Sequence, residues 1–216
     1  MIIAILALQG AFAEHQQMLQ KLGADSILIR NLSDWLEFIG RDEPKGLIIP
    51  GGESTAMKRI MRDENLVEPI RSAIAGGLPT FGTCAGMILL SKKIEGSDSE
   101  SFLGDAAMNV VVRRNAYGRQ LGSFYTEESF GDISSSEDEK VPMTFIRAPF
   151  IVEVGEDVKV LAKVDGNIVA VRQGSLLATS FHPELNDDLR VHRYFLGMIG
   201  LGKGKKKVVI PTTHLL

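Results

Sequence analysis

Short runs of apolar residues alternate with amphipathic segments through the first half of the chain. A nearly all-apolar run such as 2–8 (IIAILAL) is typical of a strand buried on both faces, as in a parallel sheet covered by helices. Segment 11–23 gathers apolar side chains near one helical face and ends at Gly23. The pattern predicts strands at 2–8, 25–30, 46–50 and 77–82, and helices at 11–23, 34–39 (with Ser33 as N-cap), 54–74 and 85–93.

The alternation of predicted strands and helices ends at about residue 95, and β-rich segments then follow one another. The segments 108–114, 157–164, 167–173 and 175–181 are predicted strands, with a hairpin turn through Asp165 and Gly166. The acidic, serine-rich stretch 131–140 is predicted to be a solvated loop, and 188–200 the last helix. We therefore expect an α/β fold in three layers, with a mostly parallel central sheet, flanking helices and a partly antiparallel β section.

We expect a single domain over residues 1–202, followed by a basic and then apolar tail over 203–216, for which a frayed end, a docked segment and a partner segment all remain open. The composition, 44% hydrophobic and 24% charged, is that of an ordinary globular protein, and the net charge of −3 argues against a nucleic-acid surface.

The start of the chain lacks the basic residues of a signal peptide, and no apolar run approaches the ~20 residues of a membrane helix. The lone cysteine excludes an internal disulfide and suits a reducing compartment. We expect a cytoplasmic protein without nucleic-acid or membrane partners.

That cysteine, Cys84, lies in the sequence GTCAG between a predicted strand and a predicted helix. Gly82 and Gly86 flank it at a spacing of two, which is the layout of a nucleophile elbow with Cys in place of Ser. A sharp, strained turn needs small neighbours, and a helix N-terminus favours the thiolate. The backbone N–H of Ala85 would face the same point and could stabilise an oxyanion.

A thiol nucleophile needs a base, and the base needs a group that orients it. His182 follows the apolar strand 175–181, at the end of the sheet where α/β sites gather, and Glu184 can reach back to its imidazole. His15 and His192 lie on predicted helices, where a packed or surface role is expected. The sequence therefore predicts the order Cys84, His182, Glu184 for a catalytic triad.

The motifs together resemble those of the glutaminase subunit of pyridoxal 5′-phosphate synthase, within the triad-type, class I glutamine amidotransferase family. GTCAG and FHPE (181–184) mark the wider family, and GGEST (51–55) and RNAYGRQ (114–120) mark this group. The motifs occur in the family's order: LALQG at 6–10, IIPGGEST at 48–55, GTCAGMILL at 82–90, RRNAYGRQ at 113–120, FIRAP at 145–149 and TSFHPEL at 179–185.

The resemblance implies hydrolysis of L-glutamine to glutamate and ammonia through a γ-glutamyl thioester on Cys84. It implies oxyanion-hole amides from Gly52 and Ala85, and no cofactor or metal. A barrel-shaped, oligomeric synthase subunit would use the ammonia to make pyridoxal 5′-phosphate from a pentose phosphate and a triose phosphate. The segment 8–10 would lie near both the oxyanion region and the partner surface, as a candidate relay between them. The glutamine-binding positions would be Gly51, Gly52, Glu53, Arg114, Ile146 and Arg147.

Two regions depart from the family's pattern, the acidic loop 129–141 and the lysine-bearing tail after Gly202. Three other functions remain open. The first is the glutaminase partner of imidazole glycerol phosphate synthesis, against which GGEST and RNAYGRQ argue. The second is a cysteine peptidase or related hydrolase, in which His usually follows the Cys directly, whereas Ala85 does so here. The third is a catalytically inactive scaffold subunit.

Overall fold

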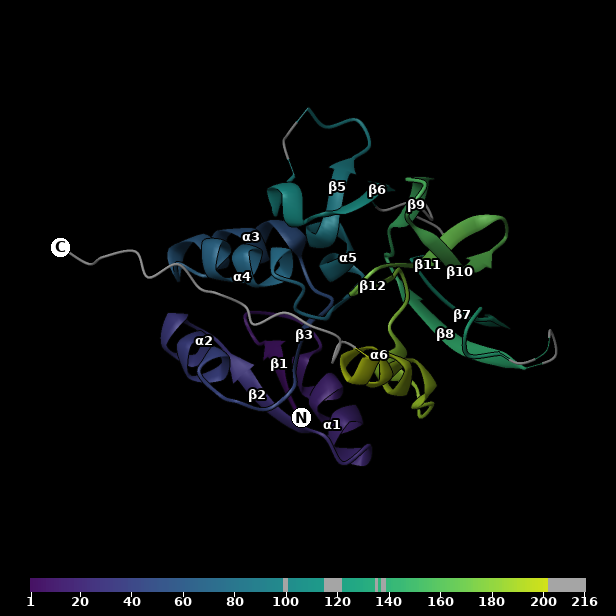
Figure 1. Ribbon diagram of the computed structural model, residues 1–216. Coiled ribbons are helices and arrows are strands. Elements are labelled where there is room, and N and C mark those ends of the chain that lie inside the picture. The colour runs from purple at the N-terminus through teal and green to yellow at the C-terminus, as the bar shows by residue number, and fades with distance from the viewer. Residues whose placement is uncertain (99–100, 115–121, 135, 137–138, 202–216) are drawn as a thin grey trace.

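The computed structural model describes residues 1–216 except 99–100, 115–121, 135, 137–138 and 202–216. Its main feature is a 10-stranded sheet whose path runs β2-β1-β3-β4-β12-β11-β9-β6-β5, with β10 paired to β11 (Figure 1). The parallel half consists of β1 (Ile2–Leu6), β2 (Asp25–Ile29), β3 (Lys45–Ile49), β4 (Thr80–Thr83) and β12 (Leu176–Thr179).

Helices cover both faces of this half, which confirms the predicted three layers. Alternate residues of β1 enter opposite cores: Ile3 and Ile5 join the core under α1 and α6, while Ala4 and Leu6 join the core under the other helices. Burial on both faces explains why the parallel strands are nearly uniformly apolar. The helices are α1 (Phe12–Lys21), α2 (Leu32–Ile39), α3 (Ser54–Asp63), α4 (Val67–Ala75), α5 (Ala85–Leu90) and α6 (Arg190–Leu201).

The second half of the chain forms the predicted antiparallel section. Strands β10 (Lys159–Val164) and β11 (Asn167–Gln173) are joined by a turn in which Asp165 and Gly166 both have positive φ, as the predicted hairpin requires. The same sheet contains β5 (Ser91–Ile94), β6 (Met108–Arg113) and β9 (Phe150–Val154), with the 3₁₀ turn η1 (Gly104–Ala106) before β6.

A separate two-stranded sheet pairs β7 (Ser123–Ser129) with β8 (Lys140–Ile146), and the sequence patterns did not predict either strand. The buried residues Val141, Met143 and Phe145 of β8 pack into the core under α1 and α6. The hairpin therefore covers the edge of that core next to the last helix (Figure 1).

Three sequence predictions are wrong in detail. The helix predicted over 54–74 is two helices, α3 and α4, because Asn65 adopts a left-handed conformation (φ 54°) that ends the first. The helix predicted over 85–93 stops at Leu90, and the next residues form β5 alongside β6. Asn31, and not Ser33, caps α2 by accepting a hydrogen bond from the Asp34 N–H (3.0 Å).

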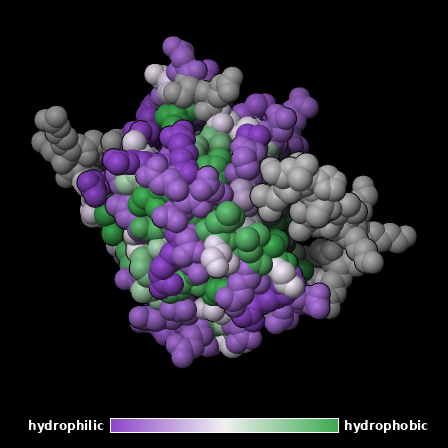
Figure 2. Space-filling model, turned by 90° about the vertical axis from the view of Figure 1, so that its left-hand side faces the viewer, coloured by the Kyte–Doolittle hydropathy of each residue, from purple (hydrophilic) through white to green (hydrophobic). Residues whose placement is uncertain are grey.

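On the side of the molecule where α2 lies, hydrophobic residues are scattered among hydrophilic ones (Figure 2). Leu36 of α2, 58% exposed, is the most exposed large aliphatic residue in the described part of the chain. No helix in the described ranges is both long and apolar enough to cross a membrane.

Candidate active site

Cys84 occupies the sharp turn between β4 and α5, as the elbow pattern predicted. Its backbone has φ 50° and ψ −103°, a conformation that residues with a Cβ rarely adopt, and its N–H donates to the Thr179 carbonyl of β12 (2.8 Å). A Cβ on Gly82 would lie 2.7 Å from the backbone of Gly86. The turn is therefore held by the neighbouring strand and depends on the flanking glycines.

His182 and Glu184 lie side by side after β12. The His182 Nδ1 atom is 2.7 Å from Glu184 Oε1, and both residues are buried. A 3₁₀ turn, η2 (Pro183–Leu185), brings the carboxylate back toward the ring, and the His182 backbone N–H donates to the Thr144 carbonyl of β8 (2.8 Å). The predicted contact between the Glu184 carboxylate and the His182 imidazole is thus confirmed.

The site favours an imidazolium on His182. Burial lowers the pKa of His182, but its hydrogen bonds with the Cys84 sulfur and the Glu184 carboxylate outweigh that effect and raise the pKa to about 10. Since Nδ1 contacts the carboxylate, Nε2 is the ring nitrogen left for the sulfur. The pKa of Glu184 is lowered, because its interactions with His15 and His182 outweigh the opposing effect of burial.

The elbow and the histidine face one cavity of about 490 Å³, which is in the usual range for small-molecule sites. Glu184 is not part of the lining and lies behind His182, bonded to its Nδ1. The other sequence-predicted site residues meet there, although they come from five separate stretches of the chain: Gly51, Gly52, Glu53, Cys84, Ala85, Arg114, Ile146, Arg147 and His182.

The two glycines after β3 allow three backbone segments to approach one another. A Cβ on Gly51 would stand 2.3 Å from the His182 Cε1 atom. A Cβ on Gly10, which has φ 81°, would stand 1.6 Å from the Gly51 carbonyl oxygen. Gly51, Gly52, Gln9 and Gly10 therefore form one wall of the site, and a larger side chain at Gly51 would push into the imidazole.

Glu53 is fixed by the start of α3. Its carboxylate accepts hydrogen bonds from the Thr55 N–H (2.9 Å) and the Ala56 N–H (2.7 Å), and these bonds lower its pKa. Glu53 therefore caps this helix, and Ser54 is its first residue. Arg114 Nη2 lies 3.5 Å from Glu53 Oε1 in a half-exposed ion pair at the mouth of the cavity.

Sequence reasoning did not single out Gln9, whose Oε1 accepts a hydrogen bond from the Glu53 N–H (3.0 Å). The resemblance placed its segment, Leu8 to Gly10, near the oxyanion region, but no residue pattern indicated this contact 44 residues away. Residues 115–120 of the RNAYGRQ motif lie outside the described residues. Ile146 also meets the site through its carbonyl oxygen, 3.9 Å from Cys84 Sγ.

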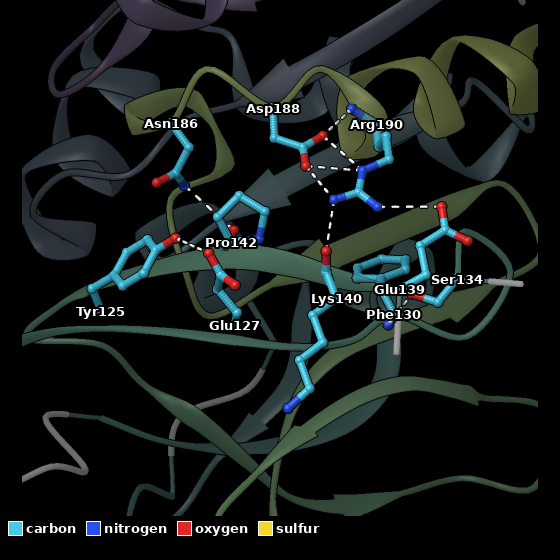
Figure 3. Close-up of polar contacts among 10 residues, drawn as sticks. All are labelled: Tyr125, Glu127, Phe130, Ser134, Glu139, Lys140, Pro142, Asn186, Asp188 and Arg190. Atoms are coloured by element: carbon cyan, nitrogen blue, oxygen red, sulfur yellow. Dashed lines mark hydrogen bonds and ion pairs between the residues drawn. The ribbon is translucent and has the colours of Figure 1, made fainter. Parts of the chain in front are cut away.

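Polar contacts attach the β7–β8 hairpin to the segment that follows the candidate triad (Figure 3). Arg190 donates to the Lys140 carbonyl (2.7 Å) and forms ion pairs with Asp188 and Glu139. Asn186 donates to the carbonyls of Pro142 (3.4 Å) and His182 (3.2 Å) and contacts the Thr144 hydroxyl (2.9 Å). The hairpin thus supports the turn that carries His182.

This arrangement can carry out acyl transfer. A sulfur at a helix N-terminus, a buried imidazole and a buried carboxylate supply a nucleophile, a proton carrier and an orienting group. Among the residues that the structure describes, no group of three or more His, Cys, Asp and Glu side chains could hold a metal ion.

Comparisons with known proteins identify a family. The model of the "SNO glutamine amidotransferase family" matches residues 5–200. A Streptococcus pneumoniae (strain CGSP14) protein named "Pyridoxal 5'-phosphate synthase subunit PdxT" is 56% identical over 198 residues, which cover 92% of this chain and 97% of that protein. A protein of the same name from strain ATCC 700669 / Spain 23F-1 is 54% identical over the same shares of the two chains.

Solved structures agree with this result. One described as "Crystal structure of glutamine amidotransferase" superposes with a TM-score of 0.81 at 40% identity, covering 92% of this chain and 98% of that one. A putative GMP synthase subunit from Thermoplasma acidophilum gives a TM-score of 0.63 at 18% identity, over 93% and 94% of the two chains, a likeness that concerns the fold alone.

Proposed function

The chain belongs to the SNO glutamine amidotransferase family, and we propose that it is the glutaminase subunit of a pyridoxal 5′-phosphate synthase, with Cys84, His182 and Glu184 as its catalytic triad. One observation carries the assignment of the residues. The elbow sulfur and the Glu184-bonded imidazole face a single cavity that is lined by the glutamine-binding motifs.

The first half-reaction breaks the side-chain amide of glutamine. The Cys84 sulfur attacks the amide carbon, and the imidazolium of His182 gives its proton to the departing nitrogen. The C–N bond breaks, ammonia leaves, and a γ-glutamyl thioester remains on Cys84. Because the hydrogen bonds of His182 raise its pKa to about 10, the proton is available at neutral pH.

The second half-reaction restores the enzyme. His182, now neutral, takes a proton from water as the oxygen attacks the thioester carbon, and the C–S bond breaks to release glutamate. Glu184 accepts the Nδ1–H through both steps, which keeps Nε2 directed at the reacting atoms. The backbone N–H groups of Gly52 and Ala85 are proposed to hold the oxyanion that forms twice.

The polar lining suits the charged end of glutamine. Arg114 and Arg147 line the cavity and can bind the α-carboxylate, while the fixed Glu53 carboxylate can attract the α-ammonium group. Gly51, Gly52 and Ile146 would complete the pocket with backbone groups. Because Glu53 is already held by the amides of α3, binding glutamine would not need to order it.

We assign the ammonia to a barrel-shaped, oligomeric synthase subunit that combines it with a pentose phosphate and a triose phosphate. The support is the name shared by the relatives, a pyridoxal 5′-phosphate synthase subunit. The cytoplasm is the proposed location, because the mechanism needs a reduced thiol and Cys84 is free in the structure. Neither nucleic acid nor membrane enters the proposed reaction.

The test is ammonia release from L-glutamine by the purified chain, measured with and without the synthase subunit of a relative's complex. Glutamate and ammonia in equal amounts, increased by the added subunit, are the expected result. Ammonia release that the synthase subunit does not change would contradict the proposed partnership. Peptide cleavage without glutaminase activity would favour a cysteine hydrolase.

A further inference from the structure

A second histidine, His15, lies next to Glu184 of the candidate triad. His15 of α1 is fully buried, and its Nε2 lies 3.5 Å from Glu184 Oε2 and 3.2 Å from Thr83 Oγ1. Its other nitrogen, Nδ1, lies 2.9 Å from Nε2 of His192 on α6. Two helices on the same face of the sheet therefore bring a pair of imidazoles to the carboxylate that orients His182.

Glu184 Oε2 needs such a donor. Oε1 contacts His182 Nδ1, whereas Oε2 is buried and makes no hydrogen bond within the described part of the chain. A buried acceptor left without a partner costs about 1–3 kcal/mol, and more when it is charged. His15 Nε2, which lies 3.5 Å away on another element, could supply the proton.

The tautomers of the two imidazoles can be inferred from their surroundings. In one arrangement His15 Nδ1–H donates to His192 Nε2, and the proton of the neutral His192 is then on Nδ1, a buried atom with no partner in the described residues. In that arrangement His15 Nε2 carries no proton and points its lone pair at the carboxylate. If His192 Nε2–H donates to His15 Nδ1, the only unpaired atom is an acceptor and His15 Nε2 carries a proton that faces Glu184 and Thr83. Both arrangements leave His192 Nδ1 unpaired, but only the second avoids turning a lone pair toward the carboxylate and supplies a donor to it.

Burial disfavours the charged form of both imidazoles. It lowers the pKa of His15, although Glu184 acts in the opposite direction, and it lowers the pKa of His192 to about 3. The titratable groups that face this cluster are Glu184 and His182 from the triad and Glu14 on the outer side of α1. In its neutral form the pair can donate a hydrogen bond without adding a charge next to the imidazolium of His182.

From this geometry we propose that His15 is a positioning residue, whose Nε2–H is shared between Thr83 Oγ1 and Glu184 Oε2 and so keeps the carboxylate ionised and its Oε1 aimed at His182, with His192 fixing the tautomer of His15. The proposal deepens the glutaminase function proposed above and rests on the triad. No bond is made or broken at His15. Its effect reaches the reacting atoms through Glu184 and His182.

Two amide substitutions distinguish this role from simple packing. In His15→Gln the amide nitrogen lies near the position of Nε2 and can still donate to Glu184. In His15→Asn the amide reaches only as far as Nδ1, where its oxygen can accept from His192 Nε2–H, so that contact is kept and the donor to Glu184 is lost. Leu19→Ala is the control for stability, because it removes a buried side chain from the same helix without touching the triad.

The first readout is alkylation of Cys84 by iodoacetamide over a range of pH. The chain has a single cysteine, so the rate reports the reactive thiolate alone and needs no turnover of glutamine. The second readout is kcat and KM for glutamine in the presence of the synthase subunit. If the wild-type complex releases no ammonia, the proposed function fails, and the alkylation profile still tests His15.

We expect the pH midpoint of alkylation in His15→Asn to rise by about one unit, and kcat to fall about tenfold while KM changes less than about twofold. His15→Gln should retain most of the wild-type behaviour, and Leu19→Ala should lower the melting temperature without moving the midpoint. The proposal is overturned if His15→Asn matches the wild type in both readouts. It is equally overturned if Leu19→Ala shifts the midpoint as much as His15→Asn does.

Discussion

Gly86 packs so tightly against Ile49 that a Cβ on residue 86 would stand 2.0 Å from the Ile49 carbonyl oxygen. The contact joins the first turn of α5 to the end of β3 and sets how closely the helix that follows Cys84 can approach the sheet. Residue 86 must therefore be glycine because there is no room for a Cβ, whether or not the turn also needs a flexible backbone there.

Replacing this glycine should displace the nucleophile. In Gly86→Ala, α5 must move away from β3, and we expect a loss of about 1–3 kcal/mol or more in the free energy of unfolding, together with slower alkylation of Cys84. Urea denaturation and iodoacetamide kinetics measure the two effects.

Gly197→Ala is the matched control for that substitution. It places the same methyl group on α6, where no atom lies within 4 Å, and should gain up to about 1 kcal/mol from helix propensity. Equal effects of the two substitutions would contradict the packing argument.

Cys84→Ala should abolish ammonia release and leave the fold and the partner contact intact. Alanine keeps a Cβ at the strained position, so the turn loses only a small, nearly buried sulfur. Ammonia production, thermal melting and co-purification with the synthase subunit give the three measurements. Ammonia release at the wild-type rate would remove Cys84 from the mechanism.

The proposed triad residues could be singled out from the sequence because each of them is marked locally. Cys84 has glycines at both sides within a strand-to-helix boundary, and His182 and Glu184 lie two positions apart after an apolar strand. Such short-range patterns can be recognised in the sequence without knowledge of the fold. The hairpin through Asp165 and Gly166 was predictable for the same reason, since its two residues must accept positive φ.

The elements that were missed depend on contacts distant in sequence. Strand β7 is polar on its open face, and its extended form comes from pairing with β8, on the far side of the acidic loop. The break at Asn65 was hidden because buried residues continue on both sides of it, from Met61 to Ile70.

His15 illustrates the limit most clearly. A histidine on the apolar face of a helix was expected to be a packed or surface residue, and it is packed. Its neighbours, however, are Thr83, Glu184 and His192, which lie 68, 169 and 177 positions away in the sequence. No periodicity or motif reports such a cluster, because it exists only once α1 and α6 cover the same face of the sheet.

Arg114→Ala should raise KM for glutamine about tenfold or more and change kcat less, because a charged hydrogen bond to the substrate is worth about 1.5–3 kcal/mol. The measurement is steady-state kinetics with the synthase subunit present. Arg113→Ala is the matched control, since the neighbouring arginine pairs with Glu95 and lies over Phe150, outside the cavity. Wild-type kinetics in Arg114→Ala would remove this residue from the glutamine site.

The buried histidine pair should make the protein sensitive to acid. The folded state holds the pKa of His192 near 3, whereas the unfolded chain binds a proton near the ordinary value of 6.5. The stability contributed by this neutral histidine is therefore present above pH 6.5 and is lost as the pH falls toward 3, by about 1.4 kcal/mol per pH unit. In His192→Phe the free energy of unfolding, measured with urea at several pH values, should fall less steeply over that interval. The control is Phe195→Leu on the same helix, which should lower the free energy of unfolding at every pH but keep its wild-type dependence on pH. If the free energy of unfolding of His192→Phe depends on pH as the wild type does, this imidazole is already charged in the folded protein.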